Sequence, residues 1–165
     1  MRIIGIDPGS RITGVGIIEV QGERVRAVHY GVIKAGNGEF PQRLGLIFDG
    51  LRQLLAEHRP EAGAVESVFL SHNAGSALKL GQARGAAICA LIDGGLSVAE
   101  YSPRSVKQAI VGRGGADKVQ IQHMVRVLLG LAETPVEDAA DALAVALCHQ
   151  HTQQTAKRMQ ALERP

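Results

Sequence analysis

The hydrophobic pattern of this chain first changes its period after residue 43, and this change restricts the folds open to it. Residues 2–7, 12–20 and 24–34 are rich in apolar and β-branched residues or alternate in polarity, and short turns separate them. Such a pattern predicts three strands of an antiparallel meander. From Leu44 the apolar residues follow helical spacing until Pro60 ends the segment. The chain therefore begins with a sheet and continues with a helix.

The remaining residues predict further strands and helices in alternation. Small and apolar residues at 62–66 and 96–101 indicate two more short strands. Helical patterns occupy residues 74–92, a segment capped by Ser102 and Pro103, residues 116–129, and a last helix that opens on Thr134-Pro135-Val136-Glu137 and runs to about Gln154. This order predicts an α/β protein with a five-stranded mixed sheet flanked by helices.

Length and composition indicate one globular domain. The chain has 165 residues, of which 45% are hydrophobic and 21% charged, and we expect a single domain over residues 1–155 with a polar, flexible tail at 156–165. No apolar run approaches the ~18 residues of a membrane span. The first seven residues match neither a signal peptide nor a transit peptide. We therefore expect a cytoplasmic protein without a membrane partner.

The cysteines and two late histidines offer no catalytic or metal pattern. Cys89 and Cys148 are too far apart to form a metal-binding motif, and each lies among apolar neighbours, so we expect two small buried residues. His149 and His151 diverge on a helix, and we expect them on the surface. No serine or cysteine has a recognisable histidine and aspartate partner, which disfavours covalent catalysis.

The predicted helix at 74–92 carries unusually small residues. Gly75, Gly81 and Gly85 lie on it among several alanines. Each glycine inside a helix costs about 1 kcal/mol relative to alanine. Their number suggests that another backbone, from a helix or the sheet, approaches this one closely.

The charges are unevenly distributed, although the net charge is only +2. Residues 79–126 hold seven bases and three acids, whereas residues 131–141 hold four acids and no base. A basic stretch and a separate acidic cluster are suited to a polyanion and a divalent metal, respectively. On charge alone, however, an ordinary solvated surface is the favoured explanation of the basic stretch.

Four carboxylates form the candidate catalytic set. Asp7 and Glu66 each close a short buried strand, where a carboxylate is costly unless it is paired, hydrated or bound to metal. Asp138 and Asp141 are three residues apart, which places them on one face of the last helix. Oxygen ligands without histidine or cysteine favour Mg²⁺ or Mn²⁺. Two such ions ~4 Å apart would activate water against a phosphodiester. Taken singly, each acid also fits a turn or helix cap.

Four short motifs of the sequence form a recognisable set. They are Gly-Ile-Asp-Pro-Gly-Ser at 5–10, Val-Glu-Ser-Val-Phe at 65–69, Tyr-Ser-Pro-Arg-Ser-Val-Lys at 101–107 and Glu-Asp-Ala-Ala-Asp-Ala-Leu-Ala at 137–144. Together they resemble the RuvC family of bacterial Holliday-junction resolvases, in the family's order and spacing, from Met1 to about His151. The resemblance implies a ribonuclease H-like fold, a homodimer, and Mg²⁺-dependent cleavage of four-way DNA junctions by two symmetric nicks in recombination and repair, leaving 5′-phosphate and 3′-OH ends.

The same resemblance implies roles for individual residues. Asp7, Glu66, Asp138 and Asp141 match the family's metal-binding catalytic acids, which implies two Mg²⁺ ions per site, with Mn²⁺ as a substitute. Lys107 and Lys118 match basic residues beside the active site, and both would face the scissile phosphate. Phe69 matches an aromatic residue that contacts bases near the crossover. The resemblance also implies that the helix at 74–92 contributes to the dimer. It further implies that a branch-migration motor of the RuvA and RuvB type is a partner.

Three arginines are additional DNA-binding candidates, and three other functions stay open. We expect Arg84, Arg104 and Arg113 to contact phosphates.

A ribonuclease H-like nuclease that cuts an RNA–DNA hybrid would use the same acids and differ in its recognition of the 2′-OH. An ATPase of the actin and sugar-kinase type has a similar first phosphate loop but requires two lobes. A non-catalytic junction-binding protein would leave the four acids unexplained.

Overall fold

The computed structural model describes residues 1–67 and 73–162 and contains a five-stranded mixed sheet in the order β3-β2-β1-β4-β5. Antiparallel pairing joins β1, β2 and β3, whereas β1, β4 and β5 are parallel. The meander and the two later strands are thus confirmed. The strands are β1 (Arg2–Asp7), β2 (Ile12–Gln21), β3 (Arg24–Lys34), β4 (Ala62–Glu66) and β5 (Val98–Tyr101).

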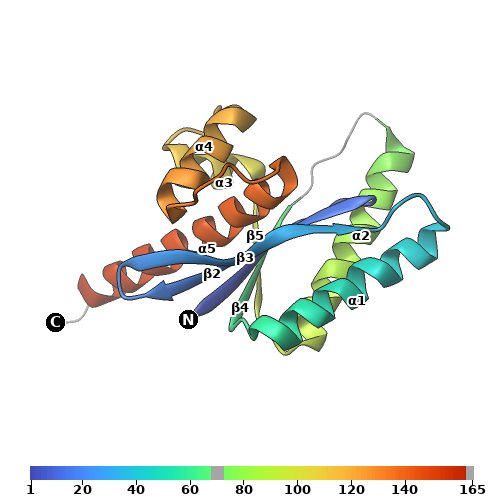
Figure 1. Cartoon of the computed structure of the whole chain (residues 1–165). Helices are drawn as coiled ribbons and strands as arrows, with labels where there is room; N and C mark the ends of the chain where they lie inside the picture. The colour runs from blue at the N-terminus through green and yellow to red at the C-terminus, as the bar shows by residue number, and fades with distance from the viewer. Residues whose placement is uncertain (68–72, 163–165) are drawn as a thin grey trace.

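Helices cover both faces of the sheet and form a three-layer molecule (Figure 1). One core lies between the sheet and α1 and α2; the other lies between the sheet and α3, α4 and α5. Within the described ranges, no helix is long and apolar enough to cross a membrane. The helices are α1 (Phe40–His58), α2 (Ala74–Asp93), α3 (Pro103–Val111), α4 (Lys118–Leu129) and α5 (Glu137–Leu162).

Local capping residues fix the short helices α3 and α4. The Ser102 hydroxyl accepts a hydrogen bond from the Ser105 amide at 3.1 Å, as the sequence predicts. Asp117 and Gln120 form a reciprocal capping box at the start of α4. Gly130 ends α4 at φ +61°, the left-handed conformation that glycine adopts without strain. These caps set where Lys107 and Lys118 lie.

The predicted limits of α5 are wrong at both ends. The first helical bond runs from the Ala140 amide to the Val136 carbonyl, so Thr134 does not cap the helix. Buried Pro135 instead accepts a hydrogen bond from the Gln122 side chain, which ties this segment to α4. At the other end, the helix continues to Leu162, because no glycine or proline interrupts it.

Three glycines of β1 and β2 let α5 lie directly on the sheet. A Cβ atom at Gly5 would overlap the Ala142 carbonyl, and one at Gly14 would overlap the Asp138 carbonyl. A Cβ at Gly16 would lie 2.6 Å from the Leu143 amide nitrogen. The residues of α5 from 142 to 150 are buried on all sides, between the sheet and the α3–α4 pair. The glycines therefore determine how closely the acidic end of α5 approaches β1.

The glycines of α2 do not make the close contact that the sequence suggests. A Cβ at Gly81 or Gly85 would meet nothing within 4 Å in the described part of the chain. The buried face of α2 consists of alanines and a leucine, which pack between α1 and the sheet. Cys89 is exposed on this helix, contrary to expectation, whereas Cys148 is buried.

Candidate active site

Asp7 and Glu66 lie side by side at the carboxyl ends of two parallel strands. Ile6 of β1 pairs with Val65 of β4, so the residues that follow them leave neighbouring strands at the same edge. Both carboxylates are partly buried. The sequence therefore places two acids where the sheet ends and a pocket can form.

Asp138 and Asp141 reach this edge from α5, which packs on the face of β2. Asp7 pairs with Gly14 of β2, and the Asp138 carbonyl lies against Gly14. Asp141, three residues later, lines a cavity of about 250 Å³ together with Asp7 and Glu66. The remaining residues of the cavity wall are Pro103, Val106, Lys107, Lys118 and Ile121.

The carboxyl group of Asp7 is the most perturbed acid of the site. Burial and the charges of Glu66, Asp141 and Asp138 raise its pKa to about 8, against a partial opposing effect from Lys118. Burial raises the pKa because the low-dielectric surroundings disfavour the charged form, and neighbouring carboxylates act in the same direction. All four predicted acids therefore lie close enough to interact electrostatically around Asp7.

Glu66 and Asp141 are shifted for the same reasons. Burial, followed by the charge of Asp141, raises the pKa of Glu66 to about 7. Burial is also the largest cause of the raised pKa of Asp141. Lys107 and Lys118 oppose both shifts. Perturbed acids that share one cleft are typical of functional sites.

The two lysines reach the site from separate helices. Lys107 is half-buried on α3, and Lys118 is the first residue of α4. The Lys118 ammonium donates to the Glu137 carboxylate, and this hydrogen bond is the main cause of its raised pKa. Lys118 is therefore fully protonated at neutral pH, and Glu137 holds it near Asp141 and Asp7, whose charges also raise its pKa.

The chemistry of the donor set fits a hard divalent cation. Within residues 1–67 and 73–162, no three histidine, cysteine, aspartate or glutamate side chains are gathered closely enough to form a ready-made metal site. The acids nevertheless raise the pKa of Asp7 through their charges. A divalent cation would offset that repulsion, and carboxylate oxygens are the ligands that Mg²⁺ and Mn²⁺ prefer.

Comparisons with known proteins identify the family of the chain. The family model described as crossover junction endodeoxyribonuclease RuvC matches residues 3–149. The chain belongs to the RuvC family. It is 59% identical over 150 residues to the protein of that description from Alkalilimnicola ehrlichii, covering 91% of each chain. With the one from Methylococcus capsulatus it shares 55% identity over 163 residues, or 99% of this chain and 98% of that one.

A solved structure supports the same conclusion about the fold of this RuvC-family chain. The structure of Thermus thermophilus RuvC in complex with a Holliday junction substrate superposes with a TM-score of 0.89. The two chains are 38% identical, and the match covers 94% of this chain and 96% of that chain. The expected ribonuclease H-like fold is thereby confirmed.

The structure places the other predicted DNA-binding residues in different settings. Arg104 is exposed on α3, where its side chain packs against Gly114, and Arg113 is exposed in the loop between α3 and α4. Both lie on the same helical layer as Lys107. Arg84 differs, because its guanidinium pairs with Glu100 of β5 within the chain. Phe69 lies outside the described residues.

Sequence reasoning missed the buried position of His149 and its contact with Tyr101 at the end of β5. His149 is only 7% exposed, contrary to the predicted surface location, and its Nδ1 forms a 2.8 Å hydrogen bond with the Tyr101 hydroxyl. Burial lowers the pKa of His149, so the ring is neutral at neutral pH. An available signal was the apolar run from Ala142 to Cys148, which continues on all sides of the helix and so marks a buried segment.

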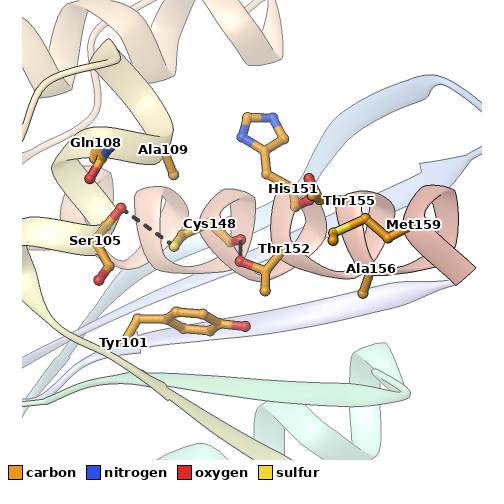
Figure 2. Close-up of a pocket in the computed structure, with 10 residues that line it drawn as sticks. All are labelled: Tyr101, Ser105, Gln108, Ala109, Cys148, His151, Thr152, Thr155, Ala156 and Met159. Atoms are coloured by element: carbon orange, nitrogen blue, oxygen red, sulfur yellow. Dashed lines mark hydrogen bonds between the residues drawn. The ribbon is translucent and has the colours of Figure 1, made fainter.

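A larger hollow, of about 710 Å³, lies away from the acids, between Tyr101, α3 and the second half of α5 (Figure 2). Its walls are mainly apolar, and they hold none of the four predicted carboxylates. Burial raises the pKa of the Cys148 thiol to about 11, so this cysteine is not a nucleophile at neutral pH. Size alone therefore does not mark the active site here; the smaller cavity has the reactive groups.

Proposed function

We propose that this chain is a structure-selective endonuclease that resolves four-way DNA junctions by paired symmetric nicks. The observation that carries the proposal is the convergence of Asp7, Glu66, Asp138 and Asp141 at one edge of a RuvC-family fold. Those acids come from β1, β4 and α5. Such an enzyme resolves the junctions that form as intermediates of recombination and repair. Because bacterial chromosomal DNA lies in the cytoplasm, we infer that the protein acts there.

The four acids would hold two Mg²⁺ ions, with Mn²⁺ as a substitute. When bound, such a pair activates water and stabilises the leaving 3′ oxygen of a phosphodiester. Asp7 lies at the centre of the carboxylate set, since the other three acids all affect its pKa, and it is our candidate for the shared ligand. Lys107 and Lys118 place two positive charges at the cavity, where they would face the scissile phosphate. The expected products carry 5′-phosphate and 3′-OH ends.

DNA binding would use the exposed bases of the α3–α4 layer. Arg104 and Arg113 are solvent-accessible and carry no ion pair in the described part of the chain. Each phosphate contact that they make would weaken with salt. We retain Phe69 as the candidate for stacking on a base near the crossover, a contact worth about 1–3 kcal/mol.

A homodimer fits the task and the surface of α2. A C₂ dimer has two identical active sites, which matches two equivalent strands in a junction. Gly81 and Gly85 leave a small-residue surface on α2 that no described part of the chain covers. We propose that α2 of a second copy packs there. A branch-migration motor of the RuvA and RuvB type is a further proposed partner.

The deciding experiment compares DNA cleavage by the wild type and Asp7→Asn. The substrates are a labelled immobile four-way junction, a linear duplex and an RNA–DNA hybrid, each with Mg²⁺. We expect paired nicks in the junction alone, lost in Asp7→Asn while junction binding survives.

Other outcomes would replace the proposal. Cutting of the hybrid instead would indicate a hybrid-specific nuclease with the same metal site. If the immobile junction is bound but not cut, thymine-rich junctions that can branch-migrate are tested next, because the family prefers such sites. If these also stay intact, the protein is a non-catalytic junction-binding protein.

A further inference from the structure

Arg84 of α2 is engaged inside the protein rather than free on its surface. Its Nε donates a 3.3 Å hydrogen bond to the main-chain carbonyl of Glu66, and its guanidinium forms an ion pair with the Glu100 carboxylate of β5. Only 20% of the side chain is exposed. The contact is with the backbone of a proposed metal ligand, at the point where β4 ends.

A second set of contacts holds the same strand end. The amide and the hydroxyl of Ser67, the next residue, donate to the Tyr101 carbonyl at 2.8 Å and 3.1 Å. The Tyr101 hydroxyl is hydrogen-bonded in turn to His149 of α5, the helix that carries Asp138 and Asp141. The end of β4 is therefore tied to α2, to β5 and to α5.

These contacts answer a physical problem of the site. Burial disfavours the charged form of Glu66, and the charge of Asp141 repels it as well. Glu66 pairs with Tyr101 at the end of β5, a strand of four residues that forms one edge of the sheet. A short edge pairing resists displacement weakly, so the strand end needs additional support. Arg84 supplies it by a charge-assisted hydrogen bond to the Glu66 carbonyl.

We propose that Arg84 is a positioning residue for Glu66, held in its orientation by Glu100, and not a contact to DNA phosphate. This inference rests on the proposed nuclease function of the same acids. The Arg84 side chain is largely buried, and its guanidinium is held on two sides by the Glu100 carboxylate and the Glu66 carbonyl, so it offers little accessible surface to a phosphate and would release few counterions from DNA. Residues that orient metal ligands typically change metal affinity or activity about 10–100-fold when they are removed.

The test separates binding from cleavage in Arg84→Gln and Glu100→Gln. Junction binding is measured at several salt concentrations in EDTA, and single-turnover cleavage at saturating enzyme is measured against Mg²⁺ concentration. We expect both variants to bind within about twofold of the wild type with the same salt slope. We expect both to need more Mg²⁺ and to cut about 10–100-fold more slowly at low Mg²⁺.

Two control variants make the result specific. Arg52→Gln removes a comparable arginine from a surface pair with Asp93, whose Nε–Oδ2 distance is 3.3 Å, and should leave binding and cleavage unchanged. Arg104→Gln removes an exposed arginine of the proposed DNA surface. It should weaken binding and reduce the salt slope by about 0.9 without changing the Mg²⁺ requirement.

Three results would overturn the inference. The first is weaker, less salt-sensitive binding by Arg84→Gln with an unchanged Mg²⁺ requirement, which would make Arg84 a phosphate contact. The second is an Arg84→Gln variant that matches the wild type in every measurement. The third is faster or unchanged cleavage by Glu100→Gln, the variant that decides the matter if Arg84→Gln does not fold.

A readout without cleavage keeps this test separate from the proposed function. The rise in the melting temperature Tm on adding Mg²⁺ reports metal binding directly. We expect a smaller rise in Arg84→Gln than in the wild type, and an equal rise would count against a positioning role. If the wild type binds Mg²⁺ but cuts no junction, the proposed function fails while this comparison still judges Arg84.

Discussion

The two helical layers of this molecule use glycine in opposite ways. On one face of the sheet, the backbone of α5 occupies the space that side chains would take at Gly5, Gly14 and Gly16, so that helix and strands are in direct contact. On the other face, Gly81 and Gly85 of α2 meet nothing in the described chain, and alanines make the packing contacts. The same residue type therefore serves an internal contact in one layer and leaves an uncovered surface in the other.

The difference shows how the site depends on the α5 layer. The Asp138 carbonyl lies over Gly14, and Gly14 is the register partner of Asp7. Because the strand glycines have no side chain, α5 can approach β1 and β2 closely, and this approach brings Asp138 and Asp141 near Asp7. In the described part of the chain, nothing comparable constrains the outer face of α2 at Gly81 and Gly85, so added volume there would mainly affect a partner that binds to this face.

The largest expected effect is that of Gly14→Ala. The added Cβ would overlap the backbone carbonyl of Asp138, which cannot move without shifting α5, so we expect a loss of at least about 3 kcal/mol in unfolding free energy. Cleavage should fall with it. Gly45→Ala on α1, where a Cβ meets nothing, is the matched control and should stabilise by about 0.5–1 kcal/mol. Urea unfolding of both variants measures this, and equal stabilities would show that α5 is not held by the glycine contact.

The next effect concerns the outer face of α2, through Gly81→Leu. Gly81 is exposed and an added Cβ meets nothing within 4 Å in the described chain, so we expect the monomer fold and its circular dichroism to be unchanged. If a second copy packs on this face, the side chain blocks it, and the dimer dissociation constant should rise by about tenfold or more, or about 1.4 kcal/mol. Sedimentation at several concentrations measures the constant. A dimer of unchanged affinity would place the interface elsewhere.

The sequence alone predicts most of the fold because its local signals agree with the tertiary structure. Pro60, Ser102-Pro103 and Gly130 each mark a real element boundary, whereas the period change at Leu44 lies about one turn inside α1, which begins at Phe40. All four acids are also predictable, because strand-end carboxylates and an i,i+3 acidic pair are local patterns. The resemblance of the motifs adds the family, which the family model then confirms.

The features that the sequence does not predict depend on what packs against a residue. Glycines in β2 and in α2 look alike in the sequence, yet only the former are covered. His149 follows helical spacing that suggests a surface residue, but α3, β5 and the sheet enclose this part of α5. Arg84 lies in a basic stretch, and its partner Glu100 comes from another strand. The glycine contacts and the Arg84–Glu100 pair are set by tertiary structure, so local patterns cannot reveal them, whereas the apolar run before His149 does indicate a buried segment.

Asp7→Asn should show the cost of assembling the acids so closely. The variant removes a carboxyl group that the metal-free protein can bury only by keeping it protonated or by placing its charge among three other carboxylates. We expect it to raise the stability of the metal-free protein by about 0.5–2 kcal/mol while abolishing cleavage. Thermal unfolding in EDTA measures the change, and Glu61→Gln, a change at an exposed acid outside the site, is the control. A variant less stable than the wild type would mean that Asp7 makes net favourable contacts in the metal-free protein.

The smallest effect is a pH dependence of the stability that Mg²⁺ confers. The pKa values of Asp7 and Glu66 are raised to about 8 and about 7 in the folded protein, against 3.8 and 4.5 in an unfolded chain. The folded state therefore holds these protons more tightly, and its stability from these groups is full below pH 4 and is lost as the pH rises towards 8. A divalent cation replaces the protons as the neutralising charge.

The rise in Tm caused by Mg²⁺ should therefore grow between pH 5 and pH 8. It should be nearly flat in a variant that combines Asp7→Asn with Glu66→Gln. Scanning the wild type and this variant with and without Mg²⁺ separates the contribution of the site from all other titrating groups, which both proteins share. A rise that is equal at pH 5 and pH 8 would mean that the acids are already ionised at the lower pH. In that case the close approach imposed by Gly14 would not perturb them, and the two layers would differ only in packing.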